Sequence, residues 1–358
     1  MKRKSMVAEP GERERKRLYY YLSGAVAAAV VVIVAVFVYL AGSPAHPRRD
    51  GADRIVVPQG ASAWKVGYLL RDSGLIESPR RFAWHLKYRG MSEQLKAGVY
   101  DIPRSASMRE MANRIIAADE VMVEVTFPEG WNSHQMASLL QTQGVVDSLS
   151  FVKLTNDPDF IAKMGLNVTT LEGFLYPETY VFRLRRDPEE IIQTMIGVFH
   201  NKVGVEWFEA AEKNELGLQG VVTLASIVQG EFQLPGEAPD IAAVYQNRLN
   251  QDMLLQADPT IQYILPEGPR RLTLGDLTVR NPYNTYRYKG LPPGPINNPG
   301  LEALQSALNP PDKPWLYMVA RGDGGHTFTT NYDDHLRAKR RLDAIRRQEA
   351  RRKREAGN

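Results

Sequence analysis

The stretch from Leu18 to Ala41, LYYYLSGAVAAAVVVIVAVFVYLA, contains no charged residue in 24 positions. About 20 consecutive apolar residues are enough for an α-helix to cross the hydrocarbon core of a bilayer. Tyrosines lie at both ends of the stretch, where amphipathic rings suit a membrane interface, and seven Lys or Arg residues lie within residues 1–17. The sequence therefore predicts a single-pass transmembrane helix at 18–41, preceded by a cytoplasmic basic head at 1–17.

A cleaved signal peptide is the alternative interpretation of the same stretch. Its apolar run is longer than the usual core of a signal peptide, and the AGSPAHP that follows offers only a weak cleavage site. We therefore expect an uncleaved anchor in the cytoplasmic (inner) membrane, with the rest of the chain on the extracytoplasmic side. The absence of cysteine agrees with that location but decides little.

The basic residues are concentrated at the two ends of the chain. Residues 1–17 hold seven Lys or Arg against three Glu, and residues 337–358 hold ten against three acids, so residues 18–336 carry a net charge of −7. This distribution gives no support for nucleic-acid binding, and no zinc-finger, RRM or helix-turn-helix pattern occurs. The basic tail at 337–358 could lie on anionic polymers or lipid headgroups, or remain solvated.

An internal repeat occupies the next part of the chain. The segment from Arg54, RIVVPQGASAWKVGYLLRDSGLIES, matches the segment from Val123, VEVTFPEGWNSHQMASLLQTQGVVDS, with an offset of 70 residues. A Pro-x-Gly turn and a Leu-Leu pair align in the two copies. Each copy predicts a strand, a tight turn and a short amphipathic helix.

The domain organisation follows from these patterns, and the overall fold class is α+β. We expect a linker at 42–53, a small α/β domain at 54–120 and a mixed α+β domain at 121–336, which opens with the repeat-like segment 121–152. The small domain predicts the order strand, helix, helix, strand, helix. It could bind an extended glycan on its surface, or it could serve only as a spacer.

The segment from Leu218 to Phe232, LQGVVTLASIVQGEF, predicts a helix that ends on an acidic side chain. Leu224, Val228 and Glu231 fall at i, i+4 and i+7, so Glu231 projects from the apolar face. A carboxyl group on such a face is either paired and structural, or desolvated with a raised pKa and ready to give up a proton. The helix alone does not decide between these roles.

The sequence lacks most other catalytic equipment. His326 and His335 have no third imidazole nearby, and there is no HExxH motif or cysteine pair, so we expect no metal site. Phosphate-binding loops, GxSxG and SxxK motifs and cysteine nucleophiles are also absent. What remains is carboxylate chemistry among aromatic and amide side chains, which suits a sugar substrate. We expect no bound cofactor.

Cleavage of a glycoside by two carboxylates would require a partner for Glu231. Glu172, Glu178, Glu237 and Asp258 are candidates, but their spacing validates none of them. One carboxyl suffices if a free hydroxymethyl group of the sugar closes onto its own anomeric carbon. The Glu then acts first as an acid toward the leaving oxygen, and afterwards as a base toward that hydroxyl.

A long segment at 280–300, RNPYNTYRYKGLPPGPINNPG, is rich in Pro, Gly and Asn, yet it contains three tyrosines. A disordered linker is not expected to retain so many aromatic residues. We therefore predict an ordered loop that lines a groove. Further on, PWLYMVA predicts a buried strand, and GDGGHTFTTN predicts a turn followed by its paired strand.

From about Arg54 to His335, the chain resembles the endolytic murein transglycosylases of the MltG (YceG-like) family. The order and spacing of several motifs carry the resemblance, whereas any one motif alone would be weak. These motifs are LEGFLYPETY at 171–180, ASIVQGE at 225–231, NRL at 247–249, LQADPT at 255–260, YNTY at 283–286, GLPPGPINNPG at 290–300 and GGHTFTTN at 324–331. The membrane anchor also agrees with the family, as does a LysM-like small domain, which the first repeat copy would supply.

The resemblance implies lytic cleavage of the β-1,4 bond between N-acetylmuramic acid and N-acetylglucosamine within peptidoglycan strands. The product would carry a 1,6-anhydromuramic end, with no water consumed, and Glu231 would be the catalytic residue. Family members commonly carry Glu-Lys directly before this Glu, whereas this chain has Gln229 and Gly230. Gly230 is expected to weaken the helix by about 1 kcal/mol relative to Ala. The implied partners are the glycan strands and the peptidoglycan synthases (penicillin-binding proteins).

Two motifs supply most of the expected substrate-binding residues. In LQADPT, Gln256, Asp258 and Thr260 could hold sugar hydroxyls or the N-acetyl group, although an Asp before Pro could simply start a turn. In YNTY, Tyr283, Asn284 and Tyr286 could stack on the saccharide and orient the N-acetyl group, or pack in the core. His326 is also expected to bind the substrate, as a hydrogen-bonding group.

Three other motif residues are expected to be structural. Glu178 is predicted to form a buried ion pair with an Arg, and Asn247 and Arg248 to join their helix to a loop. Two rival functions stay open: a non-catalytic glycan-binding scaffold for the synthases, and a hydrolase of the lysozyme kind.

Overall fold

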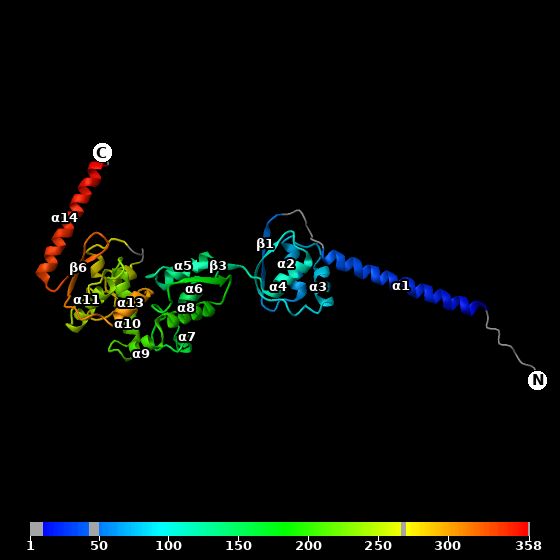
Figure 1. Cartoon of the computed structure of the whole chain (residues 1–358), viewed down its shortest axis with the longest axis horizontal. Helices are drawn as coiled ribbons and strands as arrows, with labels where there is room; N and C mark the ends of the chain where they lie inside the picture. The colour runs from blue at the N-terminus through cyan, green and yellow to red at the C-terminus, as the bar shows by residue number, and fades with distance from the viewer. Residues whose placement is uncertain (1–9, 43–49, 266–269, 357–358) are drawn as a thin grey trace, which may run out of the picture. The chain divides into compact units, whose positions relative to one another are not determined.

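The computed structural model describes residues 10–42, 50–265 and 270–356, and the chain divides into two compact units between Val121 and Met122. Figure 1 shows the order of the elements along the chain. Residues 1–9 of the expected cytoplasmic head and 43–49 of the expected linker lie outside the described residues. The same holds for residues 266–269 and for the last two residues of the expected tail.

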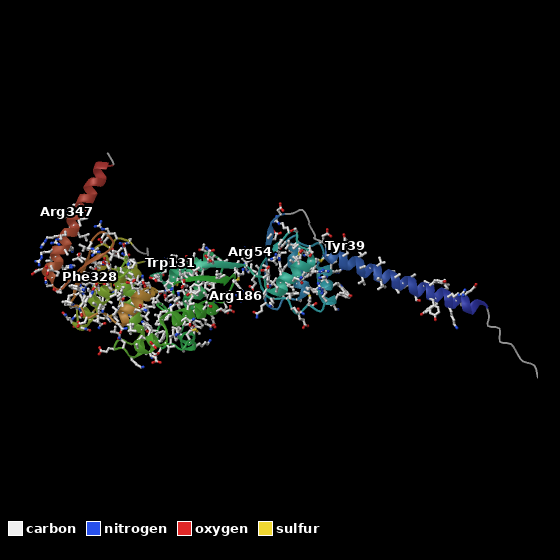
Figure 2. The ribbon with its side chains drawn as sticks, viewed as in Figure 1. Tyr39, Arg54, Trp131, Arg186, Phe328 and Arg347 are labelled. Atoms are coloured by element: carbon white, nitrogen blue, oxygen red, sulfur yellow. The ribbon has the colours of Figure 1, made fainter. Side chains whose placement is uncertain are left out.

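Helix α1 (Pro10–Gly42) contains the expected transmembrane segment. Among the described residues it is the one helix long and apolar enough to cross a membrane, and its qualifying span is Glu14–Val36. Large apolar side chains on this span, such as Val31 and Ile33, are exposed rather than packed on protein. Figure 2 shows its side chains projecting on all sides of the ribbon, with Tyr39 near its C-terminal end.

The first unit contains the strand–helix–helix–strand–helix order that the sequence predicts. Strands β1 (Ala52–Val57) and β2 (Gly98–Pro103) pair antiparallel, with Ile55 opposite Tyr100. Three helices complete the unit: α2 (Ala63–Asp72), α3 (Pro79–Tyr88) and α4 (Met108–Ala117). Their apolar faces share one buried core with the strands, which includes Val66, Leu70, Phe82, Leu86 and Ile115.

The second unit opens with the second repeat copy. Strand β3 (Met122–Thr126) is followed by helix α5 (Ser133–Thr142), as predicted. Two further helices, α6 (Ser148–Leu154) and α7 (Pro158–Lys163), come after α5, and β3 then pairs antiparallel with β4 (Thr179–Arg183). Both copies therefore adopt the same local structure, and both strands pair with a segment well beyond their own helix.

A group of helices surrounds α10 (Gly217–Glu231). Residues Val221 to Val228 of α10 are all buried, because neighbouring helices cover every side of it. The expectation of a single apolar face was therefore too narrow, since an all-apolar helix is typical of a core position. The helices that pack on α10 are α9 (Val205–Lys213), α11 (Ala238–Asn250), α12 (Asp258–Ile264) and α13 (Leu301–Leu308), and α8 (Pro188–Val203) packs on α9 and α13.

The C-terminal part confirms the predicted strand pair but corrects its burial. Strands β5 (Tyr317–Ala320) and β6 (His326–Thr329) pair antiparallel, and η1 (Asp276–Thr278) is a short 3-10 turn before them. The first of these strands was expected to be buried, but none of its residues is fully so. Helix α14 (Tyr332–Ala356) packs on the hairpin, and β5 also packs on α11.

Candidate active site

Helix α10 ends at Glu231 on the edge of a cleft of about 850 Å³. One wall of the cleft comes from the turn and first residues of α5, the other from α12, and the loop at 296–297 contributes to its floor. Its described lining residues are Gly130, Asn132, His134, Gln135, Ser138, Gly230, Glu231, Asp258, Pro259, Gln262, Tyr263, Ile264, Leu265, Ile296 and Asn297. The buried helix thus presents its one acidic residue at the surface of a concave site.

The Glu231 carboxyl is held by a hydrogen bond from the Tyr245 hydroxyl to Oε1, at 2.6 Å. Burial is the main cause that raises the pKa of Glu231, and the Tyr245 hydrogen bond opposes it; the charge of Asp258 raises the pKa and that of Arg248 lowers it, so that the pKa is about 7. The carboxyl end of α10 adds to the rise, because a helix C-terminus disfavours a negative charge. Glu231 is therefore a carboxyl group that can both donate and accept a proton near neutral pH.

Gly230 brings α10 and α12 together. A Cβ atom at this position would lie 2.6 Å from the Cβ of Pro259, closer than side chains approach each other. The sequence suggested that this glycine loosens the helix, yet α10 continues through it to Glu231. Gly230 instead allows α12 to lie against the last turn of α10, and this contact brings Asp258 into the same cleft as Glu231.

Asp258 is the other acidic residue among the described lining residues. Tyr286 donates a hydrogen bond from its hydroxyl to Asp258 Oδ1. Burial raises the pKa of Tyr286, and its bond to Asp258 and that carboxylate's charge raise it further, so the phenol remains a donor. Tyr286 thus orients the Asp258 carboxylate beside Glu231.

The remaining LQADPT residues hold the loop that precedes α12. Thr260 is fully buried and donates to the Ala257 carbonyl at 2.7 Å. Its hydroxyl also lies 2.9 Å from that of Thr285. Gln256 has a left-handed φ of 52°, and its N–H donates to the Thr285 carbonyl at 3.1 Å. Neither Gln256 nor Thr260 lines the cleft, so their contacts position Asp258.

Asn284 lies in the interior of its loop. It is fully buried, its amide donates to the carbonyls of Leu277 and Val279, and its oxygen accepts the Tyr286 N–H. Tyr283 packs against Tyr263 with ring centroids 5.0 Å apart and the ring planes tilted by 42°. Of these two tyrosines only Tyr263 lines the cleft, so the aromatic surface open to a sugar differs from the one that the sequence suggested.

His326 lies on β6, and it is not one of the described residues that line the cleft. Its ring Nδ1 lies 2.9 Å from Glu237 Oε2, and its backbone N–H donates to Glu237 Oε1. Glu237 starts α11 and follows the loop after Glu231. His326 therefore holds the C-terminal hairpin against that loop.

Three expected structural contacts can be compared with the observed ones. Asn247 donates to the carbonyls of Lys313 and Trp315, and Arg248 donates to those of Leu255 and Leu316, as predicted for residues that join a helix to a loop.

The prediction that Glu178 forms a buried ion pair with an Arg is wrong. It pairs with Lys202 rather than an Arg, at 2.5 Å, and both side chains are exposed. A surface pair of this kind is worth little to stability.

Asn297 contributes an unusual polar atom to the cleft. Its side chain is 6% exposed, and its Nδ2 donates to the Ser226 carbonyl at 2.8 Å. Its Oδ1 accepts no hydrogen bond from the described residues. A buried amide oxygen without a donor is rare, so this atom is available to an N–H or O–H group of a ligand. The position lies in GLPPGPINNPG, but no spacing in the sequence singles it out.

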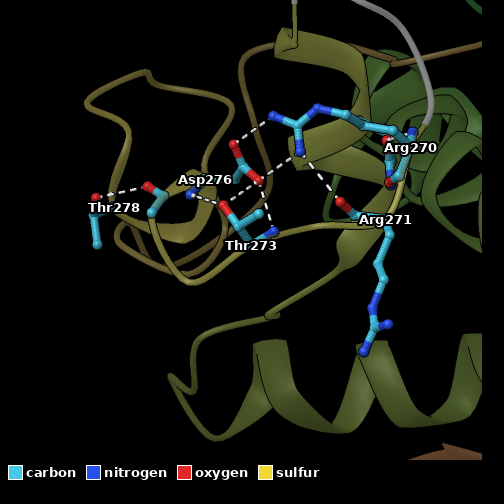
Figure 3. Close-up of polar contacts among 7 residues, drawn as sticks. Arg270, Arg271, Thr273, Asp276 and Thr278 are labelled. Atoms are coloured by element: carbon cyan, nitrogen blue, oxygen red, sulfur yellow. Dashed lines mark hydrogen bonds and ion pairs between the residues drawn. The ribbon is translucent and has the colours of Figure 1, made fainter.

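A polar cluster anchors the segment beyond the outer end of α12. Figure 3 shows Asp276 accepting from the Arg270 guanidinium, at 2.8 Å to each oxygen, and from Thr273. These donors hold the pKa of Asp276 well below its usual range. Arg270 in turn exchanges two hydrogen bonds between its backbone and the Gln262 side chain, which lines the cleft. The cluster thus fixes one rim of the site.

Within the part of the chain that the structure describes, no three His, Asp or Glu side chains gather as metal ligands.

Comparison with known proteins identifies the family. The model of the YceG-like family matches residues 55–341, which is most of the chain. The chain belongs to the YceG-like family. The match spans the second repeat copy, α10 and the residues that line the cleft.

Individual relatives of this YceG-like protein carry informative names. It is 30% identical over 304 residues to a Bacillus subtilis protein named endolytic murein transglycosylase, covering 80% of this chain and 83% of that one. It is 29% identical over 313 residues to a Streptococcus pneumoniae R6 protein of the same name, covering 78% of this chain and 56% of that one. The crystal structure of a yceG-like protein from Listeria monocytogenes matches with a TM-score of 0.55 and 29% identity, covering 81% of this chain and 99% of that one.

Proposed function

We propose that this YceG-like protein is an endolytic lytic transglycosylase of peptidoglycan. The observation that carries the proposal is Glu231, a carboxyl of raised pKa fixed by Tyr245 at the edge of a cleft. The cleft has the mix of carboxylate, amide and aromatic groups that saccharides need. The names of the B. subtilis and S. pneumoniae relatives support the same activity.

In the first step, protonated Glu231 donates its proton to the oxygen of the β-1,4 bond. The bond between the anomeric carbon of N-acetylmuramic acid and that oxygen breaks, and positive charge develops on the sugar ring. Because the pKa of Glu231 is about 7, a large fraction of the carboxyl is protonated at neutral pH. Asp258, which Tyr286 orients, is the negative group in the cleft that can stabilise the developing charge.

In the second step, ionised Glu231 takes the proton of the sugar's C6 hydroxyl. The C6 oxygen bonds to the anomeric carbon and closes the 1,6-anhydro ring, so no water enters and Glu231 ends protonated again. The bond from Tyr245 occupies Oε1, which leaves Oε2 to carry the proton in both steps. One carboxyl therefore acts twice, and the second nucleophile comes from the substrate.

The experiment compares the full chain in detergent with its Glu231→Gln variant on uncrosslinked glycan strands, and the products are weighed by mass spectrometry. We expect anhydromuramic ends from the wild type and a loss of about 10²–10⁴-fold in rate for the variant. Reducing ends, heavier by one water, would show a hydrolase instead. Binding without cleavage by either protein would show a scaffold.

We also propose that α1 anchors the protein in the cytoplasmic membrane with its N-terminus inside, since its apolar span is exposed along its length. The 54–120 region would then be a LysM-like domain on the extracytoplasmic side. A hollow of about 440 Å³ in it, lined by Trp64 and Lys87 among others, offers a surface for glycan. Peptidoglycan synthases are the partners that the family resemblance implies.

A further inference from the structure

A second buried carboxylate lies behind the cleft. Glu172 is 3% exposed and is not among the described residues that line the cleft. It accepts hydrogen bonds from the Ser133 N–H at 3.0 Å, the Ser133 hydroxyl at 2.7 Å and the Asn298 amide at 2.8 Å. Burial raises the pKa of Glu172 to about 7, while these donors oppose the rise. All of its partners can donate, so they match the ionised form.

The donors to Glu172 belong to the α5 wall and to the segment that forms the floor of the cleft. Ser133 is the first residue of α5, and its neighbours Asn132 and His134 line the α5 wall. Asn298 directly follows Ile296 and Asn297, which form the floor. The carboxylate thus joins two lining segments that are far apart in the sequence, and each joint lies one residue from a lining side chain.

Asn298 extends this connection into a small network. Its Oδ1 accepts the N–H groups of Gly173 and Leu175, at 2.9 and 3.0 Å, and its Nδ2 also reaches the Trp131 carbonyl. Its backbone carbonyl accepts the Gly130 N–H at 2.9 Å. Trp131, labelled in Figure 2, lies in the turn before α5. The turn, the floor and the segment around Glu172 are therefore tied by main-chain as well as side-chain bonds.

Gly173 fixes this network relative to the catalytic helix. Its φ is 91°, and a Cβ there would lie 2.6 Å from Val222 on α10 and 2.8 Å from Pro295. The backbone beside Glu172 thus lies directly on α10, the helix that ends at Glu231. Glycine is needed here for both the conformation and the close approach.

We propose that Glu172 is a positioning residue that holds the α5 wall and the Ile296–Asn297 floor in register with Glu231. This inference rests on the proposed function, since it names what aligns the sugar with the catalytic acid. Only a carboxylate fits the role, because Gln would turn an N–H₂ group toward donors that need an acceptor. An isolated buried charge is unfavourable, so the Glu172 carboxylate needs the hydrogen-bond donors from both lining segments.

The test uses the full chain with Glu172→Gln, and with Glu178→Gln as a matched control in the same motif. Glu178 is exposed and paired with Lys202, outside the network. We expect Glu172→Gln to raise KM for glycan strands about tenfold and to speed amide exchange at Gly130, Ser133 and Asn298. The control should leave both unchanged. Glu172→Gln without a change in KM or exchange would overturn the proposal.

A merely structural role is separated by Phe151→Ala, a core variant in α6 that leaves the network intact. If this variant raises KM as much as Glu172→Gln at an equal loss of Tm, Glu172 has no positioning role. Should Glu172→Gln fail to fold, Ser133→Ala, which removes one donor, replaces it in every assay. If the wild type cleaves nothing, the proposed function fails. In that case the role of Glu172 is decided by comparing the Glu231→Gln variant with the double variant that also carries Glu172→Gln. The two measurements are amide exchange and glycan binding.

Discussion

The two copies of the strand–turn–helix repeat have nearly the same backbone but different partners. In the first copy, Ser62 caps α2, and Ala63 follows as an apolar residue. In the second, Asn132 caps α5 through a capping box, and Ser133 donates to the buried Glu172. Each turn and helix start lines a hollow, and the lining of the second hollow includes Glu231.

The difference shows how a repeated fragment acquires a specific role. The local signals in both copies fix only the strand, the turn and the helix, because they act within a few residues. A single change from an apolar residue to Ser at the helix start gives the second copy a donor to a carboxylate 39 residues away. The place of the second copy in the cleft thus depends on contacts with residues that lie outside its own sequence pattern.

Among substitutions that keep Glu231 itself, the largest expected effect comes from Tyr245→Phe, compared with Tyr68→Phe on α2. Loss of the Tyr245 hydroxyl removes a bond that fixes Glu231 and lowers its pKa. We expect kcat to fall by about 10–100-fold, because a hydrogen bond to a charged group is worth about 1.5–3 kcal/mol. Steady-state kinetics check this. Tyr68 lines neither hollow, so an equal loss in Tyr68→Phe would show that the effect does not come from the hydrogen bond to Glu231.

The pH dependence of kcat/KM tests the same acid. In the proposed mechanism cleavage begins with protonated Glu231, so kcat/KM should be level below its pKa of about 7 and fall tenfold per pH unit above it. In Tyr245→Phe the midpoint should move upward, since the hydroxyl that lowers the pKa is gone. A profile that rises across pH 7 would show that the ionised form is required first.

The free energy of unfolding should also depend on pH, because the pKa of Glu231 differs between the folded and the unfolded chain. The folded pKa of Glu231 is raised, so its favourable contribution is complete below the unfolded value near 4.5 and is lost as the pH rises through 7. Glu231→Gln has no such loss, so its Tm relative to wild type should increase from pH 5 to pH 8. Thermal unfolding at both pH values measures the difference.

The reciprocal substitutions Ser133→Ala and Ala63→Ser test whether the hydrogen bond from Ser133 to Glu172 distinguishes the two copies. We expect Ser133→Ala to lower kcat/KM by roughly tenfold, since a donor to a buried carboxylate is worth about 1–2 kcal/mol. Ala63→Ser adds a hydroxyl at the corresponding place in the first copy and should leave cleavage unchanged. Kinetics and Tm of both variants check the prediction, and similar losses in the two would contradict it.

A smaller effect is expected from Gly230→Ala. The added Cβ meets Pro259, so α12 must shift and carry Asp258 with it. We expect kcat to fall several-fold with little change in KM, as for a displaced charge near the reaction centre. Gly197→Ala on α8, where a Cβ meets no atom within 4 Å, is the control. Equal activity of the two variants would show that the contact is unimportant.

The smallest effect is expected from His134→Ala, and its counterpart in the first copy is Trp64→Ala. Both residues follow a helix start and line their hollow. His134→Ala should raise KM a few-fold without changing kcat. Trp64→Ala should weaken binding to intact sacculi but leave the cleavage of short soluble strands unchanged, because those strands need only the cleft. Sedimentation with sacculi measures the first-copy effect.

Sequence patterns were sufficient to predict the elements and to place Glu231 at the end of its helix, but not to predict the contacts of the rest of the site. Both repeat copies, α10 and the final hairpin follow from periodicity and turn residues. The partners of Glu231 and Glu172 do not, because Tyr245 lies on the next helix and Asn298 lies 126 residues from Glu172. Asn284 and Thr260 were expected to contact sugar, yet they bond their own loops, since an isolated polar residue gives no sign of its burial.

The most direct test of the account is cleavage of glycan strands in water enriched in ¹⁸O. If Glu231 uses the substrate's own C6 hydroxyl, the new muramic ends have the anhydro mass and carry no ¹⁸O, and Glu231→Gln forms them far more slowly. New ends that are heavier by one labelled water would contradict the account, because water would then be the nucleophile in the cleft.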